Sequence, residues 1–335
     1  MLERKQALMI CLIIATVFYI VYQKTMNYEI FGLPVPKPHP LAFHRESVDL
    51  SDKLFTYQLN LSYFEKEFPA LQSYNCTLLI DKKDFCHSAN TKPLFILSIK
   101  SYPASFNRRA ALRKTWAKEK EISRYLMKPL FLIATSPSQK QMNLVADEDK
   151  AFKDILLWDF MESHHNLSLK ERCFLEWLFD NCQKAEFIFK GDDDGFVNPK
   201  ALVKHVRNTA NASQILHGAL QRYSTVMRSG KYRVSNSIFP YQKYPSFLSG
   251  GGFIFPGGHI PALYAVSMRL PVFPLDDVYF GFLSLAAGLT FRHDKKFYVF
   301  GMEDKTCLYK EALFVHGITT EKLLQVWRDF QEKKC

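Results

Sequence analysis

Several features that mark common classes of protein are missing from this chain of 335 residues. None of the seven cysteines forms a CxxC pair, which argues against a zinc site. No run of lysine and arginine is interleaved with aromatic residues, so the sequence does not indicate a nucleic-acid-binding protein. Internal repeats and low-complexity tracts are also absent, and a composition with 47% hydrophobic and 23% charged residues excludes a disordered, collagen-like or polytopic membrane protein. The net charge of +11 favours acidic partners such as phosphorylated small molecules or anionic membrane surfaces.

Long apolar runs are scarce, and the clearest one spans residues 7–22, directly after Arg4 and Lys5. At a rise of about 1.5 Å per residue, a helix of this length is slightly short for a bilayer core of about 30 Å but sufficient for a thinner membrane. No small-x-small cleavage site follows the run, so we expect a retained signal-anchor rather than a cleaved signal peptide. The two basic residues place the tail of residues 1–6 in the cytosol and the rest of the chain in the lumen.

The segment after the anchor carries further signs of a lumenal location. Residues 31–40 are dense in proline and predict an extended stem, and we assign residues 23–85 to the stem and an N-terminal lumenal region. Six cysteines follow the anchor, an even number that fits three disulfides in an oxidising compartment but leaves their pairing open. Four N-x-S/T sequons are candidate glycosylation sites. Their asparagines are Asn60, Asn75, Asn166 and Asn211.

Strand and helix patterns alternate from residue 93 onward. Short apolar runs at 94–99, 129–135, 154–160 and 186–190 are typical of strands that are buried on both faces, and segments that favour helices lie between them. Ser168 and Glu171 form a capping box that predicts the start of one of these helices. The alternation predicts an α/β fold with a mostly parallel central sheet and helices on both faces, in which ligands bind beyond the carboxyl ends of the strands.

Three consecutive carboxylates, Asp192, Asp193 and Asp194, follow the last of these strands. On an exposed loop they would form only a solvated turn. At the ligand-binding edge of a sheet their mutual repulsion calls for a cation, and hard divalent ions such as Mg²⁺ or Mn²⁺ bind oxygen-rich clusters together with phosphate oxygens. The spacing excludes an EF-hand, because no glutamate closes the loop. We therefore expect a divalent metal site here.

A second acidic cluster, Asp276 and Asp277, precedes an apolar helix rich in small residues. These carboxylates would either cap the helix or supply a general base, and the spacing alone does not decide between the two. The run Gly250, Gly251 and Gly252 matches neither GxGxxG nor a Walker A loop. Three glycines permit close approach of the backbone to a ligand, or merely a bend.

Two further features are open to both a structural and a functional interpretation. Arg109 and Arg113 lie four residues apart on one helix face, where they would be either solvated or in contact with a diphosphate. His316 follows an apolar, strand-like segment, and a lone histidine in such a place is more often a core or surface residue than a ligand.

Six separated segments, in the same order, resemble glycosyltransferase family 31, the β-1,3-glycosyltransferases. They are RRAALRKTW (108–116), ILLWDF…HNLSLKE (155–171), FIFKGDDDGFVNP (187–199), YPSFLSGGGFIF (244–255), PLDDVYFG (274–281) and CLYKEALFVHG…LLQVW (307–327). The resemblance covers residues 86–335, and the β-1,3-N-acetylglucosaminyltransferase branch is the most similar. It implies a GT-A catalytic domain over residues 86–335. This domain would transfer a sugar from a UDP-sugar donor with inversion of configuration at the anomeric carbon.

The resemblance also implies roles for the candidate residues. Asp192, Asp193 and Asp194 match a DxD-type motif, and Asp194, Asp192 and His316 would hold Mn²⁺ or Mg²⁺. Asp277 matches the catalytic base, and Asp276 is its neighbour. The residues expected to bind the donor are Arg109, Arg113, Asp192, Asp193, Gly250, Gly251 and Gly252.

The implied activity is transfer of N-acetylglucosamine from UDP-GlcNAc to the 3-hydroxyl of a galactose-terminated glycan on a glycoprotein or glycolipid, at the Golgi membrane. Gly195 and Leu248-Ser249 depart from the family pattern near the expected donor sugar, so a β-1,3-galactosyltransferase that uses UDP-galactose is the first alternative. A catalytically silent lumenal partner of another transferase is the second, although the intact acidic clusters argue against it. The acceptor glycan and any oligomer with itself or with other transferases stay open.

Overall fold

The computed structural model describes residues 47–52, 54–87, 92–302 and 306–332. The predicted tail, the anchor at 7–22 and the proline-rich part of the stem lie outside the described residues. Within the described ranges, no helix is both long and apolar enough to cross a membrane.

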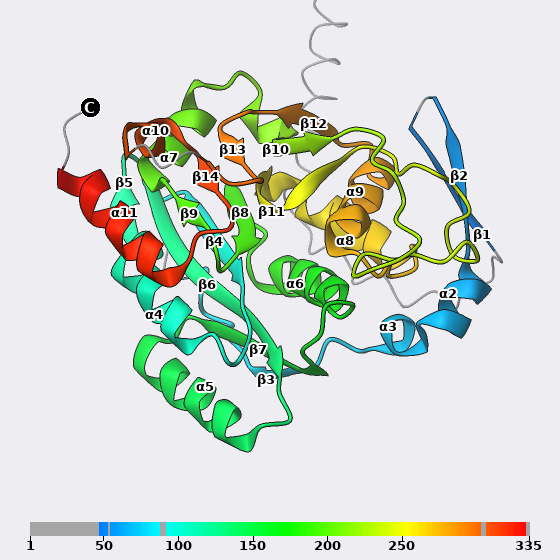
Figure 1. Cartoon of the computed structure of the whole chain (residues 1–335), viewed down its shortest axis with the longest axis horizontal. Helices are drawn as coiled ribbons and strands as arrows, with labels where there is room; N and C mark the ends of the chain where they lie inside the picture. The colour runs from blue at the N-terminus through cyan, green and yellow to red at the C-terminus, as the bar shows by residue number, and fades with distance from the viewer. Residues whose placement is uncertain (1–46, 53, 88–91, 303–305, 333–335) are drawn as a thin grey trace, which may run out of the picture. The chain divides into compact units, whose positions relative to one another are not determined.

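A nine-stranded mixed sheet positions every other element (Figure 1). Its strands are β3 (Leu78–Ile80), β4 (Leu94–Lys100), β5 (Lys120–Ile122), β6 (Tyr125–Thr135), β7 (Ile155–Met161), β8 (Phe187–Asp192), β10 (Ile215–Gln221), β11 (Phe247–Pro256) and β12 (Thr290–His293). The order across the sheet is β12-β10-β11-β8-β4-β6-β7-β3, and β5 pairs with β6. The four apolar runs read from the sequence are the adjacent strands β8, β4, β6 and β7, which pair in parallel.

The rest of the sheet departs from the parallel pattern. β11 is antiparallel to both β8 and β10, and β3 is antiparallel to β7. No helix lies between β10 and β11 in the chain, and antiparallel neighbours need no helical crossover. The prediction of a mostly parallel sheet is therefore correct for the centre, and the sheet as a whole is mixed.

Helices cover both faces of the sheet. They are α4 (Phe106–Lys114), α5 (Gln139–Phe152), α6 (Leu167–Asn181), α7 (Pro199–Asn208), α8 (Ile260–Ser267), α9 (Asp276–Ala286), α10 (Thr306–Glu311) and α11 (Thr320–Glu332). Along β4, Leu94 and Ile96 belong to the core beneath α6, α8 and α9, whereas Phe95 and Leu97 belong to the core beneath α4, α7 and α11. Successive residues of a strand point to opposite faces, so a strand buried on both sides reads as the continuous apolar run seen in the sequence.

Short elements complete the architecture. They are β1 (Ser47–Ser51), β2 (Thr56–Asn60), α2 (Leu61–Glu67), α3 (Pro69–Ser73), β9 (Phe196–Val197), β13 (Phe297–Tyr298), β14 (Phe314–Val315) and the 3₁₀ turns η2 (Ala212–Gln214) and η3 (Gly257–His259). β1 pairs with β2, and β13, β14 and β9 form a small sheet next to the acidic triplet.

The described residues before position 86 belong to the same compact unit as the rest, residues 40–335. Leu59 and Phe64 are fully buried in the core beneath α6, and β3 extends the main sheet. Disulfides Cys76–Cys173 and Cys86–Cys182 join this segment to α6 and to its C-terminal end. Cys307 is also disulfide-bonded. The structure thus shows no separation at the expected boundary between residues 85 and 86.

The capping box predicted at Ser168 is absent. α6 begins at Leu167, so Ser168 lies inside the helix with its buried hydroxyl unpaired. Glu171 is also buried, and its carboxylate forms an ion pair with Lys190 of β8 instead of returning to the helix start. A buried carboxylate needs a partner, and this tertiary ion pair outweighs the local motif.

The four sequon asparagines differ in their surroundings. Asn75 and Asn211 are exposed. Asn60 is half-buried and accepts a hydrogen bond from the backbone N–H of Ser62 at 3.1 Å, and the half-buried Asn166 donates one to the Met161 carbonyl at 2.7 Å. Asn75 and Asn211 are therefore the more accessible of the four predicted glycosylation sites.

Candidate active site

A cleft of about 630 Å³ lies at the carboxyl ends of β4 and β8, where the parallel-sheet rule places a ligand. Lys100 ends β4, Asp192 ends β8, and the two residues are direct partners across the strands. The cleft is lined by both acidic clusters, by Gly250 and Gly251 of β11, and by His316. Residues that are far apart in the sequence thus converge on one hollow.

The first acidic cluster has the composition of a metal site. Asp192, Asp194 and His316 each offer one ligand atom, and these atoms lie within 4.8 Å of one another. The His316 Nε2 atom lies 3.5 Å from Asp192 Oδ2 and 3.2 Å from Asp194 Oδ1. Asp194 Oδ1 is buried, and its partner among the described residues is His316, the third member of the cluster. Carboxylate oxygens with one imidazole fit a divalent ion, so these residues could hold one.

The charged groups of this cluster shift the pKa values of Asp192 and His316. Hydrogen bonds to Asp192 and Asp194 raise the pKa of His316 to about 10, against the opposing effect of burial. Burial disfavours the ionised form of Asp192, but the Lys100 ammonium at 2.9 Å and His316 lower its pKa. The carboxylate of Asp192 is therefore ionised and available at neutral pH.

Asp193 faces a different side of the cleft. Its Oδ2 atom accepts a hydrogen bond from the Ser101 hydroxyl at 2.6 Å, and its Oδ1 atom lies 3.8 Å from the Arg108 guanidinium. Burial, with the neighbouring carboxylates of Asp192 and Asp194, raises the pKa of Asp193 in spite of these partners. Asp193 lines the cleft but is not one of the three convergent ligands.

Asp276 and Asp277 form the first turn of α9 and have opposite pKa shifts. Burial opposes ionisation of Asp276, but Lys100, whose Nζ atom lies 2.5 Å from Asp276 Oδ2, lowers its pKa to about 2. Burial and the negative charge of Asp276 raise the pKa of Asp277 to about 6. Two adjacent carboxylates whose pKa values are pushed apart suit an electrostatic role for one and proton transfer for the other.

The glycines of β11 allow these side chains to pack against the strand. A Cβ atom added at Gly250 would lie 3.0 Å from Asp277 Cβ, and one added at Gly251 would lie 3.0 Å from His316 Cδ2. Gly252 does not line the cleft, and it packs instead against the ring of Phe314. The same ring occupies the space beside Gly195, where an added Cβ would clash. Gly250 and Gly251 thus leave the space that the side chains of Asp277 and His316 occupy.

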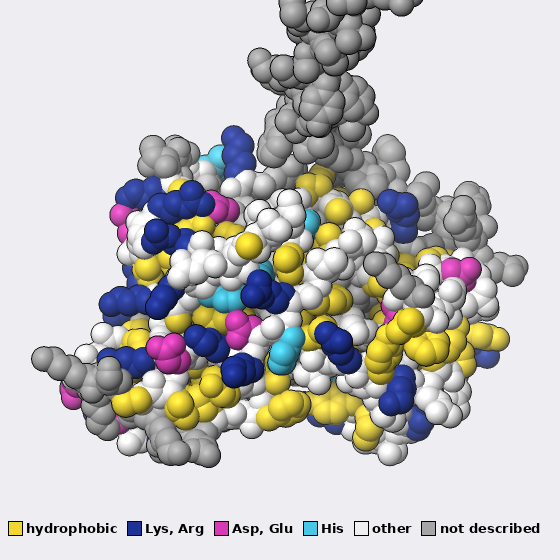
Figure 2. All heavy atoms as spheres, turned by 90° about the horizontal axis from the view of Figure 1, so that it is seen from above, with side chains coloured by type: hydrophobic (Ala, Val, Ile, Leu, Met, Phe, Trp, Pro, Cys, Tyr) yellow, Lys and Arg dark blue, Asp and Glu magenta, His cyan; other side chains and the backbone are white. Residues whose placement is uncertain are grey.

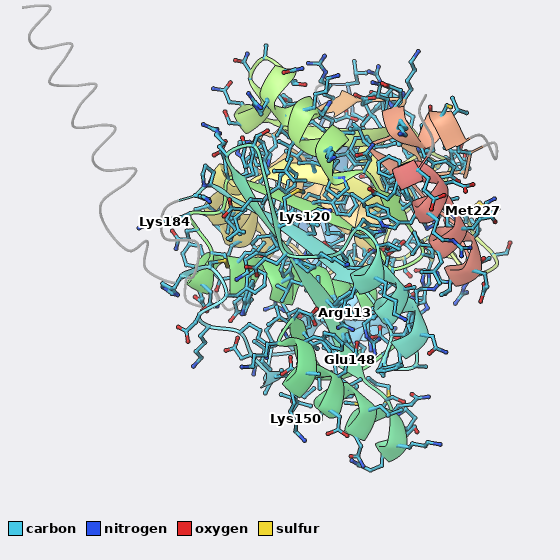
Figure 3. All side chains as sticks on the ribbon, turned by 90° about the vertical axis from the view of Figure 1, so that its left-hand side faces the viewer. Arg113, Lys120, Glu148, Lys150, Lys184 and Met227 are labelled. Atoms are coloured by element: carbon cyan, nitrogen blue, oxygen red, sulfur yellow. A yellow bond between two sulfur atoms is a disulfide. The ribbon has the colours of Figure 1, made fainter. Side chains whose placement is uncertain are left out.

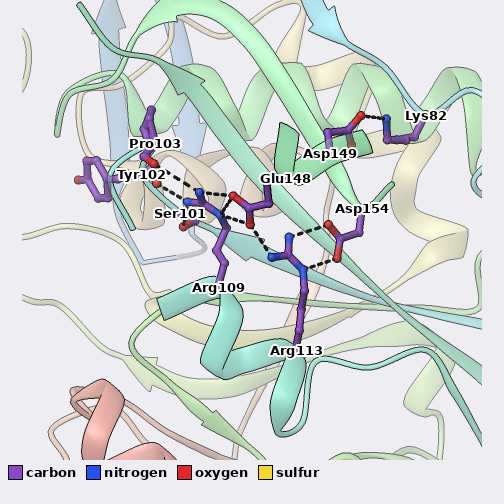
Figure 4. Close-up of polar contacts among 9 residues, drawn as sticks. All are labelled: Lys82, Ser101, Tyr102, Pro103, Arg109, Arg113, Glu148, Asp149 and Asp154. Atoms are coloured by element: carbon purple, nitrogen blue, oxygen red, sulfur yellow. Dashed lines mark hydrogen bonds and ion pairs between the residues drawn. The ribbon is translucent and has the colours of Figure 1, made fainter. Parts of the chain in front are cut away.

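The structure corrects the prediction for Arg109 and Arg113, because neither side chain lines the cleft. Both are buried in an ion-pair cluster with Glu148 of α5 and with Asp154 (Figure 4). The Arg109 Nε atom donates to Glu148 Oε1 at 2.8 Å, and the Arg113 Nε atom donates to Asp154 Oδ2 at 2.8 Å. Arg109 also donates to Ser101 Oγ at 3.1 Å, so it supports a loop of the cleft without entering it.

The sequence analysis missed Lys170 and Lys231, which line the cleft, and two further basic residues that contact its carboxylates. Lys100 joins the two acidic clusters through Asp192 and Asp276, and its only sequence signal is a lysine at the carboxyl end of a buried strand. Arg108, one residue before the predicted arginine pair, places its guanidinium 3.8 Å from Asp193 and 4.0 Å from Asp194. Adjacent residues of a helix point about 100° apart, so the i, i+4 pattern identified the shared face but not its direction.

Residues 107–295 match the family model described as Galactosyltransferase, which is more than half of the chain. The chain belongs to this family. N-acetyllactosaminide beta-1,3-N-acetylglucosaminyltransferase 2 of Mus musculus is 31% identical, over 79% of this chain and 69% of its own length. UDP-GlcNAc:betaGal beta-1,3-N-acetylglucosaminyltransferase 7 of the same organism is 32% identical, over 69% of this chain and 63% of its own length.

A third relative, acetylgalactosaminyl-O-glycosyl-glycoprotein beta-1,3-N-acetylglucosaminyltransferase of Homo sapiens, is 32% identical over 70% of this chain and 65% of its own length. Among solved structures, a glycosyltransferase involved in the glycosylation of the major capsid of PBCV-1 has a TM-score of 0.39 and 12% identity, over 70% of this chain and 99% of that chain.

Proposed function

We propose that this protein is an inverting β-1,3-N-acetylglucosaminyltransferase of the GT-A type, which transfers N-acetylglucosamine from UDP-GlcNAc to the 3-hydroxyl of a galactose-terminated glycan. The observation that carries the proposal is the convergence of two carboxylate clusters on one cleft, where Lys100 contacts both. One cluster has the donor atoms of a metal site, and the other contains a carboxyl with a raised pKa. The names of the relatives support the choice of sugar and linkage.

Asp277 is the proposed general base. Its carboxylate accepts the proton of the acceptor 3-hydroxyl while the hydroxyl oxygen forms a bond to the anomeric carbon of the donor sugar. The bond from that carbon to the diphosphate oxygen breaks, and UDP departs with the electron pair. A pKa of about 6 leaves Asp277 largely ionised near neutral pH yet basic enough to accept the proton. A single displacement of this kind inverts the anomeric configuration.

The donor diphosphate is proposed to lie beside the first cluster. Asp192, Asp194 and His316 would hold Mn²⁺ or Mg²⁺. A bound divalent ion would neutralise charge on the diphosphate of the leaving UDP. Arg108 adds positive charge at the same edge of the cleft, and Lys100 keeps Asp192 and Asp276 in place.

The donor sugar is tested with the purified full-length chain, a galactose-terminated acceptor and Mn²⁺. We expect UDP-GlcNAc to be used at least about tenfold more efficiently than UDP-galactose, which is a difference of about 1.4 kcal/mol in transition-state free energy. Linkage analysis of the product should show a β-1,3 bond. Preference for UDP-galactose would replace the proposal by its first alternative, and turnover of neither donor would favour the silent partner.

We also propose a Golgi location, with residues 1–6 cytosolic, an anchor at 7–22 and the catalytic unit in the lumen. The apolar run, the basic residues before it and the disulfides support this topology. Protein expressed in animal cells should lose apparent mass on endoglycosidase treatment, since Asn75 and Asn211 are exposed. Unchanged mobility would contradict the lumenal placement.

A further inference from the structure

A second hollow of about 490 Å³ shares no residue with the catalytic cleft. It lies between α7, α10 and the end of α11, and its lining includes Lys200, Lys204, Lys296, Lys310 and Phe330. Lysine and arginine side chains gather on the side of the molecule that carries these helices (Figure 2). The proposed transfer reaction makes no use of this hollow.

A strip of lysines and aromatic rings extends from the hollow along α11. Lys310 Nζ lies 5.6 Å from the centre of the Phe330 ring, and Phe330 stacks on Trp327 with ring centres 5.4 Å apart. Lys120 of β5, labelled in Figure 3, is another lysine of the strip. Its Nζ atom lies 5.6 Å from the centre of the Trp327 ring. Both ring side chains are half-buried, so they form a recessed floor with an ammonium group over each ring.

Four lysines of this strip have no ion-pair partner within the described part of the chain. Lys118, Lys120, Lys200 and Lys204 take part in none of the ion pairs found there. Burial, and then repulsion from Lys118 and Lys200, lowers the pKa of Lys120 to about 8. Lys200 and Lys204 lie four residues apart on α7, where like charges repel.

Four carboxylates near the strip are engaged in other ion pairs, whereas Asp329 and Glu332 flank Phe330 in α11. Glu119 lies 3.8 Å from Lys128, and Glu121 pairs with Lys92. These glutamates alternate in the sequence with Lys118 and Lys120, and alternate residues of an extended chain point to opposite sides. The two carboxylates that line the hollow are also paired, Glu311 with Lys296 at 3.3 Å and Asp294 with His205 at 3.5 Å.

We propose that this surface, formed by Lys118, Lys120, Lys200, Lys204, Lys310, Trp327 and Phe330 and named here the lysine–aromatic strip, binds a glycan chain that carries sulfate or carboxylate groups. The ammonium groups would pair with the anionic substituents, and the C–H faces of the sugar rings would pack on Trp327 and Phe330. A recessed floor beside a hollow suits a chain of sugar rings better than a flat bilayer, which would require protruding apolar side chains.

The test measures binding of a sulfated heparin-type octasaccharide to the purified full-length chain, without donor or acceptor. The variant Lys200→Glu/Lys204→Glu changes two exposed side chains of α7. We expect the dissociation constant to rise by about tenfold or more, and a milder rise for Lys200→Gln/Lys204→Gln. The desulfated octasaccharide should bind the unmodified chain at least about tenfold more weakly, and added salt should weaken binding because exposed charges are screened.

The matched control is Lys140→Glu/Lys184→Glu, which makes the same change of net charge at two exposed lysines outside the strip. It should leave the dissociation constant within about twofold. An equal loss of affinity in both charge-reversal variants would show that binding depends only on the net charge of the protein, and it would overturn the proposal. Equal binding of the desulfated octasaccharide would also overturn the proposal. So would a result in which Lys200→Glu/Lys204→Glu weakens binding to phosphatidylserine vesicles but not to the sulfated octasaccharide. UDP-sugar turnover on an uncharged acceptor should stay unchanged in both variants, so this proposal and the proposed function can fail separately.

Discussion

Two clusters of charged side chains lie close to α4, and they differ in their charge balance. In the buried cluster of Figure 4, Arg109 and Arg113 face Glu148 and Asp154, so two cations meet two carboxylates. In the catalytic cleft, Lys100, Arg108 and His316 pair with four of the five carboxylates, and no ion pair of the described residues involves Asp277. Lys170, which pairs with Glu162, and Lys231 also line the cleft. Complete pairing in a buried cluster indicates a structural role. A cleft carboxyl that has no cationic partner and a raised pKa indicates a functional site.

The sharpest way to break this comparison is to remove one carboxylate from the cleft. Asp194→Ala should abolish transfer, because it removes one of the three convergent metal-ligand atoms. The melting temperature should change little, since the change relieves repulsion with Asp193 but also removes the ion pair with His316. Wild-type activity should disappear with EDTA and return with Mn²⁺. Full activity in chelator would exclude the proposed metal role.

The next test replaces the proposed base without changing its size. Asp277→Asn should lower the turnover number by about 10²–10⁴-fold, because an amide cannot accept the acceptor proton. UDP binding measured by calorimetry should change little. Asn would retain the oxygen that accepts the Val278 N–H at 2.8 Å, so a purely structural role predicts near-normal turnover. Asp276→Asn serves as the comparison and should have a smaller effect.

The balanced cluster should respond in stability rather than in chemistry. Arg113→Met leaves Asp154 without its guanidinium partner and should lower the free energy of unfolding by about 3–5 kcal/mol. Urea denaturation checks this, with Arg124→Met as the control. Arg124 forms an exposed ion pair with Glu186, which should contribute no more than about 1 kcal/mol. If Arg113→Met instead raised the KM for the donor and left the stability unchanged, Arg113 would be a donor-binding residue, as the sequence predicted.

The smallest expected effect concerns stability as a function of pH. Burial and the charge of Asp276 raise the pKa of Asp277 in the folded protein from the ordinary 3.8 to about 6, so the ionised carboxylate weakens the folded state above pH 6. Asp277→Asn lacks this penalty. Its melting temperature should exceed that of the wild type at pH 7, and the difference should shrink as the pH falls from about 6 to below 4. A difference that is constant across this range would show that the carboxyl is not strained by its neighbour.

The sequence by itself determined much of the central architecture. Four apolar runs identified the parallel strands β4, β6, β7 and β8, because a strand that is buried on both faces must be apolar throughout. The same pattern placed Asp192 at the carboxyl end of β8, where the cleft is found. The family motifs then selected Asp277 and His316, which composition and spacing had left undecided.

Only the tertiary structure decided which side chains meet. Lys100 and Asp276 are 176 positions apart, and no local pattern encodes their contact. Arg109 and Arg113 share the predicted helix face, but in the folded chain that face meets Glu148 of α5 and does not line the cleft. Helical and strand periods extend over a few residues and fix which side chains share a face. The direction of that face depends on burial and on distant partners, which the folded chain alone supplies.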